Sequence, residues 1–322
     1  VWINNEQITS WGTNTRFAQN ADLYLTKADN VQIGAYNNTE HFDGVMAHVH
    51  CCDGTAYTPA NFGETDSTSG IWIPISSPSV TYGSKGYFLK FAAGAHGTDS
   101  SGNGNDFTVT GTATNTKDNP QNNFCTINPL DNYYPVYTFS NGNNKISTTQ
   151  TPETFITCTQ GLYQGLWYWE YEITDTGVNG NMQMGISSQI STGGVLGYAA
   201  NAYGYTGSSG DIYDGNGSTA SSYGNTYTTG DIIGVYMDLT ANKLYFGKNG
   251  VIQNSGTGIA ITAAASTDHG YYFPALGKSS GASETKVFSA NFGNGYFGTT
   301  AISGAVADEG GEGQFKYNPS TG

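Results

Sequence analysis

A short run of metal-binding side chains lies near the start of the chain. His48, His50 and Cys52 occupy alternate positions, so on a β-strand all three would project from one face. Two imidazoles two positions apart could reach one zinc ion, and the thiolate could follow. Structural zinc normally takes four protein ligands, however, and the sequence shows no fourth. We therefore favour a strand whose imidazoles bond to water or to neighbours, and we expect no metal and no other cofactor.

Oxygen ligands gather in a second segment. Asp99, Asn103 and Asn105 bring carboxylate and amide oxygens close together, and calcium prefers such ligands. The segment lacks the bidentate Glu and the spacing of a helix-loop-helix calcium site. Its Asn-Gly and Ser-Gly pairs are also ordinary turn formers. A structural turn is the favoured interpretation, and a calcium loop is the alternative.

Catalytic groups are not apparent in the sequence. Glu170 and Glu172 would share one face of a strand about 5 Å apart, the lower end of the separation that glycosidases use. They alternate with aromatic residues, however, which explains them as the solvent-facing side of a half-buried strand. No nucleophile elbow or phosphate-binding loop is present in its required context. We predict a protein without enzymatic activity.

A Tyr-rich segment is the best candidate for ligand binding. The stretch from Thr192 to Gly230 is rich in Gly, Ser and Tyr, a composition shared with binding loops, where Tyr supplies rigid amphipathic contact area. The alternative is that half of its tyrosines belong to the core. The expected ligand-contacting residues are Tyr198, Tyr213, Tyr223 and Tyr227.

The elements that would position these residues are strands. Ile232–Leu239 and Lys243–Gly247 are apolar runs that predict a buried hairpin, and Asn249-Gly250 predicts a tight turn because both central residues tolerate positive φ. Residues 166–173 alternate with period two, which predicts a half-buried strand. Its buried face would carry Trp167, Trp169, Tyr171 and Ile173.

Composition supports an all-β protein and excludes several functions. The 322 residues include 45 Gly and 23 Tyr, which favours short strands and turns with little helix. The net charge of −14, with only 11 Lys and Arg, argues against binding nucleic acid or anionic membranes. No apolar run approaches the ~20 residues that span a bilayer.

An ordered set of motifs in the second half closely resembles a SPRY domain. The resemblance covers nearly all of residues 131–300 and implies a two-sheet sandwich whose end loops bind partners. The Thr192–Gly230 stretch is longer than the family pattern, so a known peptide specificity cannot be carried over. The motifs are Trp167-Tyr-Trp-Glu170, Met184-Gly-Ile186, Tyr203-Gly-Tyr205, Gly230-Asp-Ile-Ile-Gly234, Asp238, Leu244-Tyr-Phe246, Lys248-Asn-Gly250, Phe273-Pro274 and Asn291-Phe-Gly293.

The first part of the chain resembles the end of a laminin-G-like, concanavalin-type sandwich found in virion proteins of tailed, notably marine, bacteriophages. Strands are expected throughout it, including one at residues 22–26. Its opening strands are absent, which suggests an N-terminal truncation. The motifs are Phe42-Asp-Gly44, Asp53-Gly54, Thr58-Pro59, Phe62-Gly-Glu-Thr-Asp66, Gly70-Ile-Trp-Ile-Pro74 and Gly86-Tyr-Phe-Leu-Lys-Phe91.

Together the resemblances imply two tandem antiparallel β-sandwiches of the jelly-roll kind. We expect a laminin-G-like remnant at residues 1–105, an ordered connector at 106–130, the SPRY-like sandwich at 131–300 and a glycine-rich acidic extension at 301–322. The implied function is a non-enzymatic virion protein, a fibre or surface appendage, that forms a homo-oligomer with other virion proteins and binds a host-surface glycan or protein. The alternatives are a purely architectural capsid or tail subunit, a secreted lectin or a glycan hydrolase.

Overall fold

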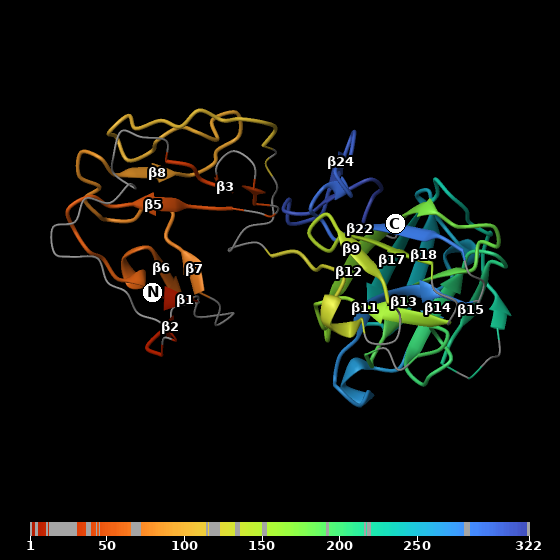
Figure 1. Ribbon diagram of the computed structural model, residues 1–322. Coiled ribbons are helices and arrows are strands. Elements are labelled where there is room, and N and C mark those ends of the chain that lie inside the picture. The colour runs from red at the N-terminus through yellow and green to blue at the C-terminus, as the bar shows by residue number, and fades with distance from the viewer. Residues whose placement is uncertain are drawn as a thin grey trace. The chain divides into compact units, whose positions relative to one another are not determined.

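The chain folds into two compact units, residues 1–123 and 124–322, which we describe separately (Figure 1). Outside short 3-10 turns, the regular elements of the described residues are strands, which confirms the all-β prediction. The turns are Pro59–Asn61, Pro129–Asp131, Asn254–Gly256 and Ala264–Ser266. The computed structural model describes residues 2–3, 6–10, 12, 31–36, 40–42, 44, 46–65, 72–113, 115, 123–132, 136–149, 153–190, 193–215, 217, 220–279 and 284–320.

Short antiparallel ladders make up the first unit. Within its described residues, each strand pairs with a single partner, and the strand expected at 22–26 lies outside these residues. The pairs are β1 (Trp2–Ile3) with β2 (Glu6–Gln7), β3 (Ala35–Tyr36) with β4 (Glu40–His41), β5 (Val49–Cys51) with β8 (Tyr87–Leu89), and β6 (Gly63–Thr65) with β7 (Trp72–Pro74).

The second unit is a sandwich of two antiparallel sheets. The eight-stranded sheet runs β19 (Val251–Ile252), β18 (Lys243–Lys248), β17 (Ile232–Asp238), β12 (Leu166–Asp175), β22 (Lys286–Asn291), β10 (Lys145–Thr148), β9 (Thr138–Ser140), with β20 (Ile259–Ala260) also on β18. The six-stranded sheet runs β11 (Thr154–Thr157), β21 (Phe273–Lys278), β13 (Met182–Ser187), β14 (Ala202–Thr206), β15 (Asp211–Tyr213), β16 (Ala220–Ser222). Two small hairpins follow, β23 (Tyr296–Phe297) with β24 (Thr300–Ala301) and β25 (Val306–Ala307) with β26 (Gln314–Phe315).

One hydrophobic core fills the space between these sheets. Tyr171 and Phe288 of the eight-stranded sheet belong to the same buried cluster as Met184, Tyr205 and Leu276 of the six-stranded sheet. Each such side chain contributes about 1.5–3 kcal/mol through removal of its apolar surface from water. The clean alternation of large apolar residues along these strands therefore fixes which face of each sheet points inward.

The hairpin predicted from the sequence is confirmed. β17 and β18 pair from Ile233 with Lys248 to Asp238 with Lys243. The backbone φ angles of Asn249 and Gly250 are 50° and 82°, as the tight turn requires. Asn249 also accepts a hydrogen bond from the backbone N–H of Ile232 at 2.8 Å through its side-chain oxygen, so this residue ties the turn to the start of the hairpin.

Strand β12 differs from its prediction on both faces. Trp167, expected inside, is 42% exposed, because it lies at the first residues of the strand, beyond the covered part of the sheet. Glu170, expected to face solvent, is fully buried. Phe315, from the C-terminal segment, packs edge-on against Tyr168 with ring centroids 4.9 Å apart, and this segment covers the outer face of β12. The residues after 300 thus include a part that packs on the sandwich.

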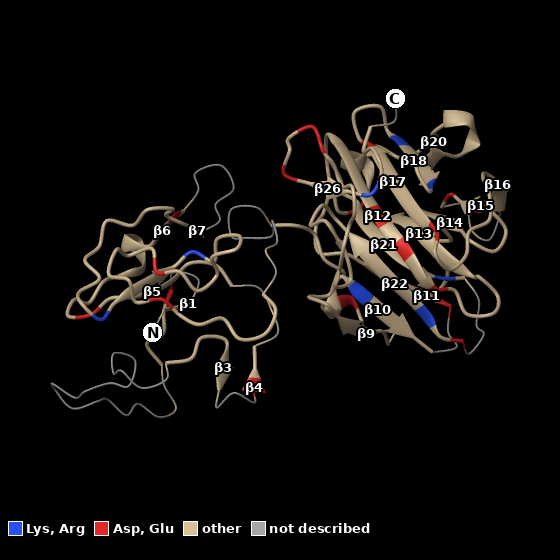
Figure 2. Ribbon diagram, turned by 90° about the horizontal axis from the view of Figure 1, so that it is seen from above, with Lys and Arg blue, Asp and Glu red and all other residues tan. Residues whose placement is uncertain are grey.

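Lys, Asp and Glu positions are sparse along the described ribbon of both units (Figure 2). The chain has 25 Asp and Glu against 11 Lys and Arg. Among the described residues, no helix is long and apolar enough to cross a membrane.

Candidate functional site

The Tyr-rich stretch from 192 to 230 is largely part of the sandwich, not a single loop. Its described residues include β14, β15 and β16, which extend the six-stranded sheet toward one edge. Tyr203 and Tyr205 of β14 are buried, in agreement with the alternative that some of these tyrosines form the core. The prediction of one long recognition loop is corrected, because tertiary pairing uses its Gly- and Ser-rich segments as short strands.

Residues 193–201 lie across the outer face of the same sheet. The Gln183 side chain holds them through two hydrogen bonds to the backbone of Leu196, accepting from its N–H at 3.0 Å and donating to its carbonyl at 3.1 Å. Leu196 is fully buried and packs with Phe155 and Ala275. This segment is therefore a fixed cover on the sheet, and it supports the tyrosine that follows.

Two of the four predicted contact residues are core residues. Tyr227 is 2% exposed, and its hydroxyl lies 2.8 Å from the carbonyl oxygens of both Met182 and Tyr205. Tyr223 is 6% exposed and accepts a hydrogen bond from the backbone N–H of Phe246 at 3.2 Å. Neither ring can reach a ligand from outside. Their prediction as binding residues is corrected, because both rings are buried and their hydroxyls bond backbone groups of neighbouring strands.

The other two, Tyr198 and Tyr213, form an accessible pair. Tyr198 is 36% exposed and Tyr213 is half-buried, and their rings meet edge-on with centroids 5.1 Å apart. A Cβ on Gly197 would lie 2.6 Å from the Tyr213 Cβ, so the glycine allows this close approach. Burial and the neighbouring Tyr198 raise the pKa of Tyr213. The Tyr213 phenol therefore stays a neutral hydrogen-bonding group at physiological pH.

Further aromatic surface occurs at the same end of the sandwich. Residues 176–181 connect the end of β12 to the start of β13, so these two strand ends lie at one end of the sandwich. The start of β12 and the end of β13 therefore lie at the other end, and the antiparallel pairing of β13, β14 and β15 places the turn after β15 there too. We call this the Tyr198 end. Tyr163, Leu166 and Trp167 are 64%, 73% and 42% exposed there. The Trp167 indole N–H donates to the carbonyl of Gln164 at 2.7 Å, which fixes the ring.

Sequence reasoning did not assign Tyr163 or Leu166 to a site and placed Trp167 in the core. A usable signal was present: these large apolar residues stand at the very start of the strand, before the first core residue of β12, Trp169. The first residues of a strand can extend beyond the edge of the facing sheet. An apolar residue there can then be exposed even when it is on the inward face of its strand.

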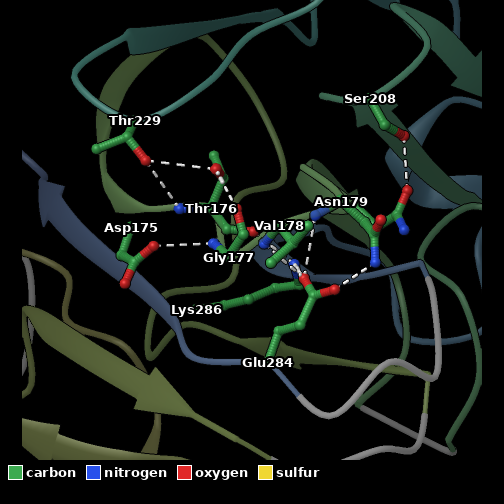
Figure 3. A network of polar contacts seen from close by, with 10 residues as sticks. Asp175, Thr176, Gly177, Val178, Asn179, Ser208, Thr229, Glu284 and Lys286 are labelled. Atoms are coloured by element: carbon green, nitrogen blue, oxygen red, sulfur yellow. Dashed lines mark hydrogen bonds and ion pairs between the residues drawn. The ribbon is translucent and has the colours of Figure 1, made fainter.

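The opposite end of the sandwich holds a polar network centred on Glu284 (Figure 3). The Glu284 carboxylate accepts hydrogen bonds from the backbone N–H groups of Val178 at 3.0 Å and Asn179 at 3.1 Å, and from the Asn179 side chain. The buried ammonium of Lys286 lies 3.2 Å from this carboxylate and donates to the carbonyl of Thr176 at 2.6 Å. With its lone pairs engaged by donors, Glu284 orders the turn after β12.

His48 and His50 of the first unit belong to an aromatic group. His50 stacks on Phe88 with ring centroids 4.0 Å apart, and its Nδ1 lies 2.9 Å from the Tyr82 hydroxyl. His48 has a φ of 51°, so it precedes the strand and does not continue the alternation toward Cys52. Among the described residues, no group of three or more His, Cys, Asp or Glu is arranged to hold a metal ion.

The predicted calcium ligands form a hydrogen-bonded turn. The buried Asp99 carboxylate accepts from the N–H of Phe88 and of Ser101, both at 2.8 Å, from that of Asn105 at 3.0 Å, and from the Ser101 hydroxyl at 2.8 Å. Burial opposes ionisation, but these bonds outweigh it and lower the pKa of Asp99. The Asn103 and Asn105 amides donate to the Gly86 carbonyl at 2.9 and 2.8 Å. The geometry is that of the structural turn favoured above.

Comparisons with known proteins identify a segment of the second unit. Residues 166–293 match the family model of the SPRY domain, and this segment is a SPRY domain, a non-enzymatic protein-interaction module. The chain is 36% identical over 99 residues to Ran-binding protein 9 of Mus musculus and of Homo sapiens, and 39% identical over 90 residues to the Ran-binding proteins 9/10 homolog of Drosophila melanogaster.

These matches are partial. The match to the mouse protein spans 30% of this chain and 14% of the relative, and that to the Drosophila protein spans 27% and 9%. Two solved structures are similar to 48% of the chain: a human SPRY domain, with 19% identity, 93% of its chain covered and a TM-score of 0.36, and the SPRY domain of human HERC1, with 17%, 91% and 0.39.

Proposed function

We propose that the SPRY domain binds a linear protein segment at the Tyr198 end, with the Tyr198–Tyr213 pair as the anchor. The observation that carries this proposal is the exposed, edge-packed pair supported from behind by the Gln183–Leu196 hydrogen bonds. Tyr is enriched in interfaces because it offers large contact area at low conformational cost. A pair fixed before binding loses little further entropy when a partner packs on it.

The partner chemistry follows from the residues near the anchor. Tyr163, Leu166 and Trp167 add apolar contact area. After burial and Tyr198, the carboxylates of Asp211 and Glu153 also contribute to the raised pKa of Tyr213, so negative charge lies near the anchor. We therefore expect a partner segment with aliphatic or aromatic anchors flanked by polar or basic residues, and an affinity that falls as salt screens the basic residues from these carboxylates.

The proposal is tested with a displayed library of random peptides selected against the full chain. Selected peptides are synthesised and titrated by calorimetry against the wild type and against variants. Tyr198→Ala and Tyr213→Ala should each weaken binding at least about tenfold, as removal of an interface anchor does. Trp167→Ala reports whether the contact extends to the start of β12.

Val178→Ala is the matched control, because Val178 is 90% exposed at the opposite end of the sandwich. It should leave peptide affinity unchanged. Equal losses for Val178→Ala and Tyr198→Ala, or peptides whose binding ignores all three aromatic substitutions, would place the binding surface elsewhere. Circular dichroism of each variant confirms that the sandwich is intact.

The narrower predictions, a phage virion appendage with a laminin-G-like first unit and a host glycan as ligand, remain predictions. They depend on the motif order in the first part of the chain, whereas the relatives named above are animal proteins. Binding of the full chain to a glycan array, compared with binding to the selected peptides, discriminates between these ligand classes.

A further inference from the structure

Strand β16 is an edge of the six-stranded sheet, and the SPRY assignment gives it no role. It is the last strand in the order of that sheet, and among the described residues it pairs with β15 alone (Figure 2). Its three residues, Ala220, Ser221 and Ser222, are all exposed. A Pro, a Lys or a bulge commonly protects such an edge, and β16 contains none of these. An exposed edge of this kind can accept a further strand.

The backbone groups of Ser222 point away from β15. The backbone N–H of Tyr223 donates to the carbonyl of Gly210 at 3.2 Å. These two residues flank the register pair of Ser222 with Asp211. In an antiparallel ladder, a bond that flanks a pair in this way identifies it as a non-hydrogen-bonded pair. The N–H and the carbonyl of Ser222 are therefore directed toward the open side of the sheet.

The same alternation applies to the rest of β16. Ser221 lies opposite Ile212 in the next pair, whose backbone bonds join the two strands. Ala220 lies opposite Tyr213, and its N–H and carbonyl are again directed outward. The edge thus offers two residues, Ala220 and Ser222, each with one donor and one acceptor, to a strand on its open side.

The side chains beside this edge indicate what an added strand should carry. Ile212 of β15 lies in the core, so its neighbours Asp211 and Tyr213 face the outer side of the sheet. Ser222 and Ala220 lie opposite these two residues on the same side, and their side chains are small. A strand added to β16 would lie about 10 Å from β15, which is two strand spacings. Its longer side chains can therefore cross the small ones and meet a carboxylate beside Ser222 and a phenol ring beside Ala220.

A complementary partner segment fits this edge better than a second copy of the chain. If β16 paired with β16 of another copy, only Ser and Ala side chains would lie next to Asp211 and Tyr213, so neither the carboxylate nor the ring would gain a partner. A segment with a positive charge and a large apolar side chain complements both groups. Tyr213 also packs edge-on against Tyr198, with ring centroids 5.1 Å apart, so the edge is continuous with the anchor of the peptide surface.

We propose that the partner segment of the SPRY domain binds as an antiparallel strand added to β16. A basic residue of the partner lies opposite Ser222 and pairs with Asp211, and an aromatic or large aliphatic residue lies opposite Ala220 and packs on Tyr213. Because the added strand runs opposite to β16, the partner motif from its N-terminus is a basic residue, any residue and then an aromatic or large aliphatic residue. This inference rests on the proposed function and specifies the conformation and sequence of the partner at the same end of the sandwich.

A scan of N-methylated peptides tests the added strand. A peptide that was selected against the full chain and carries the motif is synthesised with one N-methyl group at each position in turn, and each version is titrated by calorimetry. The backbone N–H groups of the basic and the aromatic residue donate to the carbonyls of Ser222 and Ala220, whereas that of the middle residue points to solvent. N-methylation should weaken binding at least about tenfold at the first two residues and change it little at the middle one.

Variants of the edge give a second readout. Ser222→Pro removes the outward N–H but keeps the pairing of Ser221 with β15, since an edge strand tolerates Pro where its N–H faces solvent. It should weaken the peptide about tenfold, because one backbone bond is lost and the ring projects toward the partner. Asp211→Asn should weaken only peptides that keep the basic residue, by about two- to fivefold. Ser221→Ala, a change on the other face of the same strand, is the control and should leave the affinity unchanged.

The outcomes separate this inference from the proposed function. If Tyr198→Ala and Tyr213→Ala weaken binding but N-methylation shows no alternation, the peptide uses the anchor without adding a strand. This inference is then overturned, and the proposed function stands. If the tyrosine variants also bind as the wild type does, both fail. The N-methyl scan uses the wild type, so its result does not depend on whether Ser222→Pro folds.

Three further results would overturn the added strand. They are the absence of the motif from the selected peptides, equal losses of affinity for Ser221→Ala and Ser222→Pro, and a dimer of the free chain in sedimentation that Ser222→Pro converts to a monomer. The last result would assign the edge to a second copy of the chain.

Discussion

The carboxylate of Glu170 accepts a hydrogen bond of 2.8 Å from the backbone N–H of Tyr317, a residue 147 positions away in the chain. The same carboxylate accepts from the N–H of Lys316 at 2.9 Å, from the Tyr168 hydroxyl at 2.8 Å and from the Asn291 side chain at 3.0 Å. The buried Glu170 carboxylate thus accepts hydrogen bonds from two successive backbone N–H groups, and these bonds attach the C-terminal segment to the middle of the eight-stranded sheet. Burial raises the pKa of Glu170, and these four donors oppose the rise.

Replacing Glu170 should destabilise the second unit strongly. In Glu170→Gln, the side-chain NH₂ group faces N–H and O–H groups that are themselves donors. At least one buried hydrogen bond to residue 170 is therefore lost, and the NH₂ group meets another donor at close range. We expect the free energy of unfolding to fall by about 2–4 kcal/mol, the cost of breaking a buried charged network from one side. Denaturant unfolding of the full chain, followed by Trp fluorescence, measures this loss of stability.

Glu172→Gln is the control for that experiment. Glu172 shares the face of β12 with Glu170 but is only half-buried, and its substitution should cost less than about 0.5 kcal/mol. Hydrogen exchange gives a second readout: the amides of Lys316 and Tyr317 should exchange faster in Glu170→Gln alone. Similar stability losses for both variants would show that the carboxylate does not anchor the segment.

Substitution of Gly250 should destabilise the turn for two separable reasons. Its φ of 82° disfavours any other residue, and a Cβ there would lie 2.6 Å from the Tyr317 ring. Gly256 has a φ of 78° with nothing within 4 Å of its added Cβ. Gly256→Ala therefore reports backbone strain alone, about 1 kcal/mol, and Gly250→Ala should cost about 1–2 kcal/mol more. Equal changes in the unfolding midpoints of the two variants would mean that Tyr317 moves aside without cost.

Sequence patterns predicted the structural features that depend on neighbouring residues alone. The Asn249-Gly250 turn follows from the φ preferences of two adjacent residues, and the pairing of β17 with β18 follows from that turn. The burial of Glu170 could not be predicted in this way, because its cover comes from residues near 315. Period-two alternation identifies two faces of a strand but not whether a distant segment covers the second one.

The tyrosine candidates illustrate the same limit. Tyr198 and Tyr227 lie in one Gly- and Ser-rich stretch with no difference in local composition, yet the first is accessible and the second is in the core. What separates them is long-range pairing, since the Tyr227 hydroxyl meets carbonyls of β13 and β14. Composition indicated the right residue types for a binding surface but not which members reach it.

Removing the Tyr227 hydroxyl should therefore affect stability and not binding. Tyr227→Phe leaves the ring in place but takes away the donor to the carbonyls of Met182 and Tyr205. Because Met182 also accepts from the N–H of Gly207, only part of the bonding is lost, and we expect a cost of about 1–2 kcal/mol in denaturant unfolding. Tyr198→Phe, on the surface, should cost less than about 0.5 kcal/mol. A larger loss for Tyr198→Phe would reverse the assignment of the two residues.

The partly buried His50 should make the first unit sensitive to acid. Burial against Phe88, with a smaller contribution from neighbouring His48, lowers the pKa of His50 to about 4 from the ordinary value of 6.5. The unfolded chain therefore takes up a proton between pH 6.5 and 4 that the folded unit refuses, so protonation favours unfolding in this window. The free energy of unfolding of the first unit should be level above pH 6.5 and should fall as the pH drops from 6.5 toward 4.

Two measurements check this dependence. NMR titration of the His50 ring protons should give a midpoint near pH 4, and thermal unfolding of the full chain should show a first-unit transition that shifts to lower temperature between pH 6.5 and 4. His50→Gln should remove most of that shift, whereas His41→Gln, the loss of an exposed imidazole in the same unit, should retain it. A His50 midpoint near 6.5 would mean that its ring is solvated and does not pack against Phe88 as the structure shows.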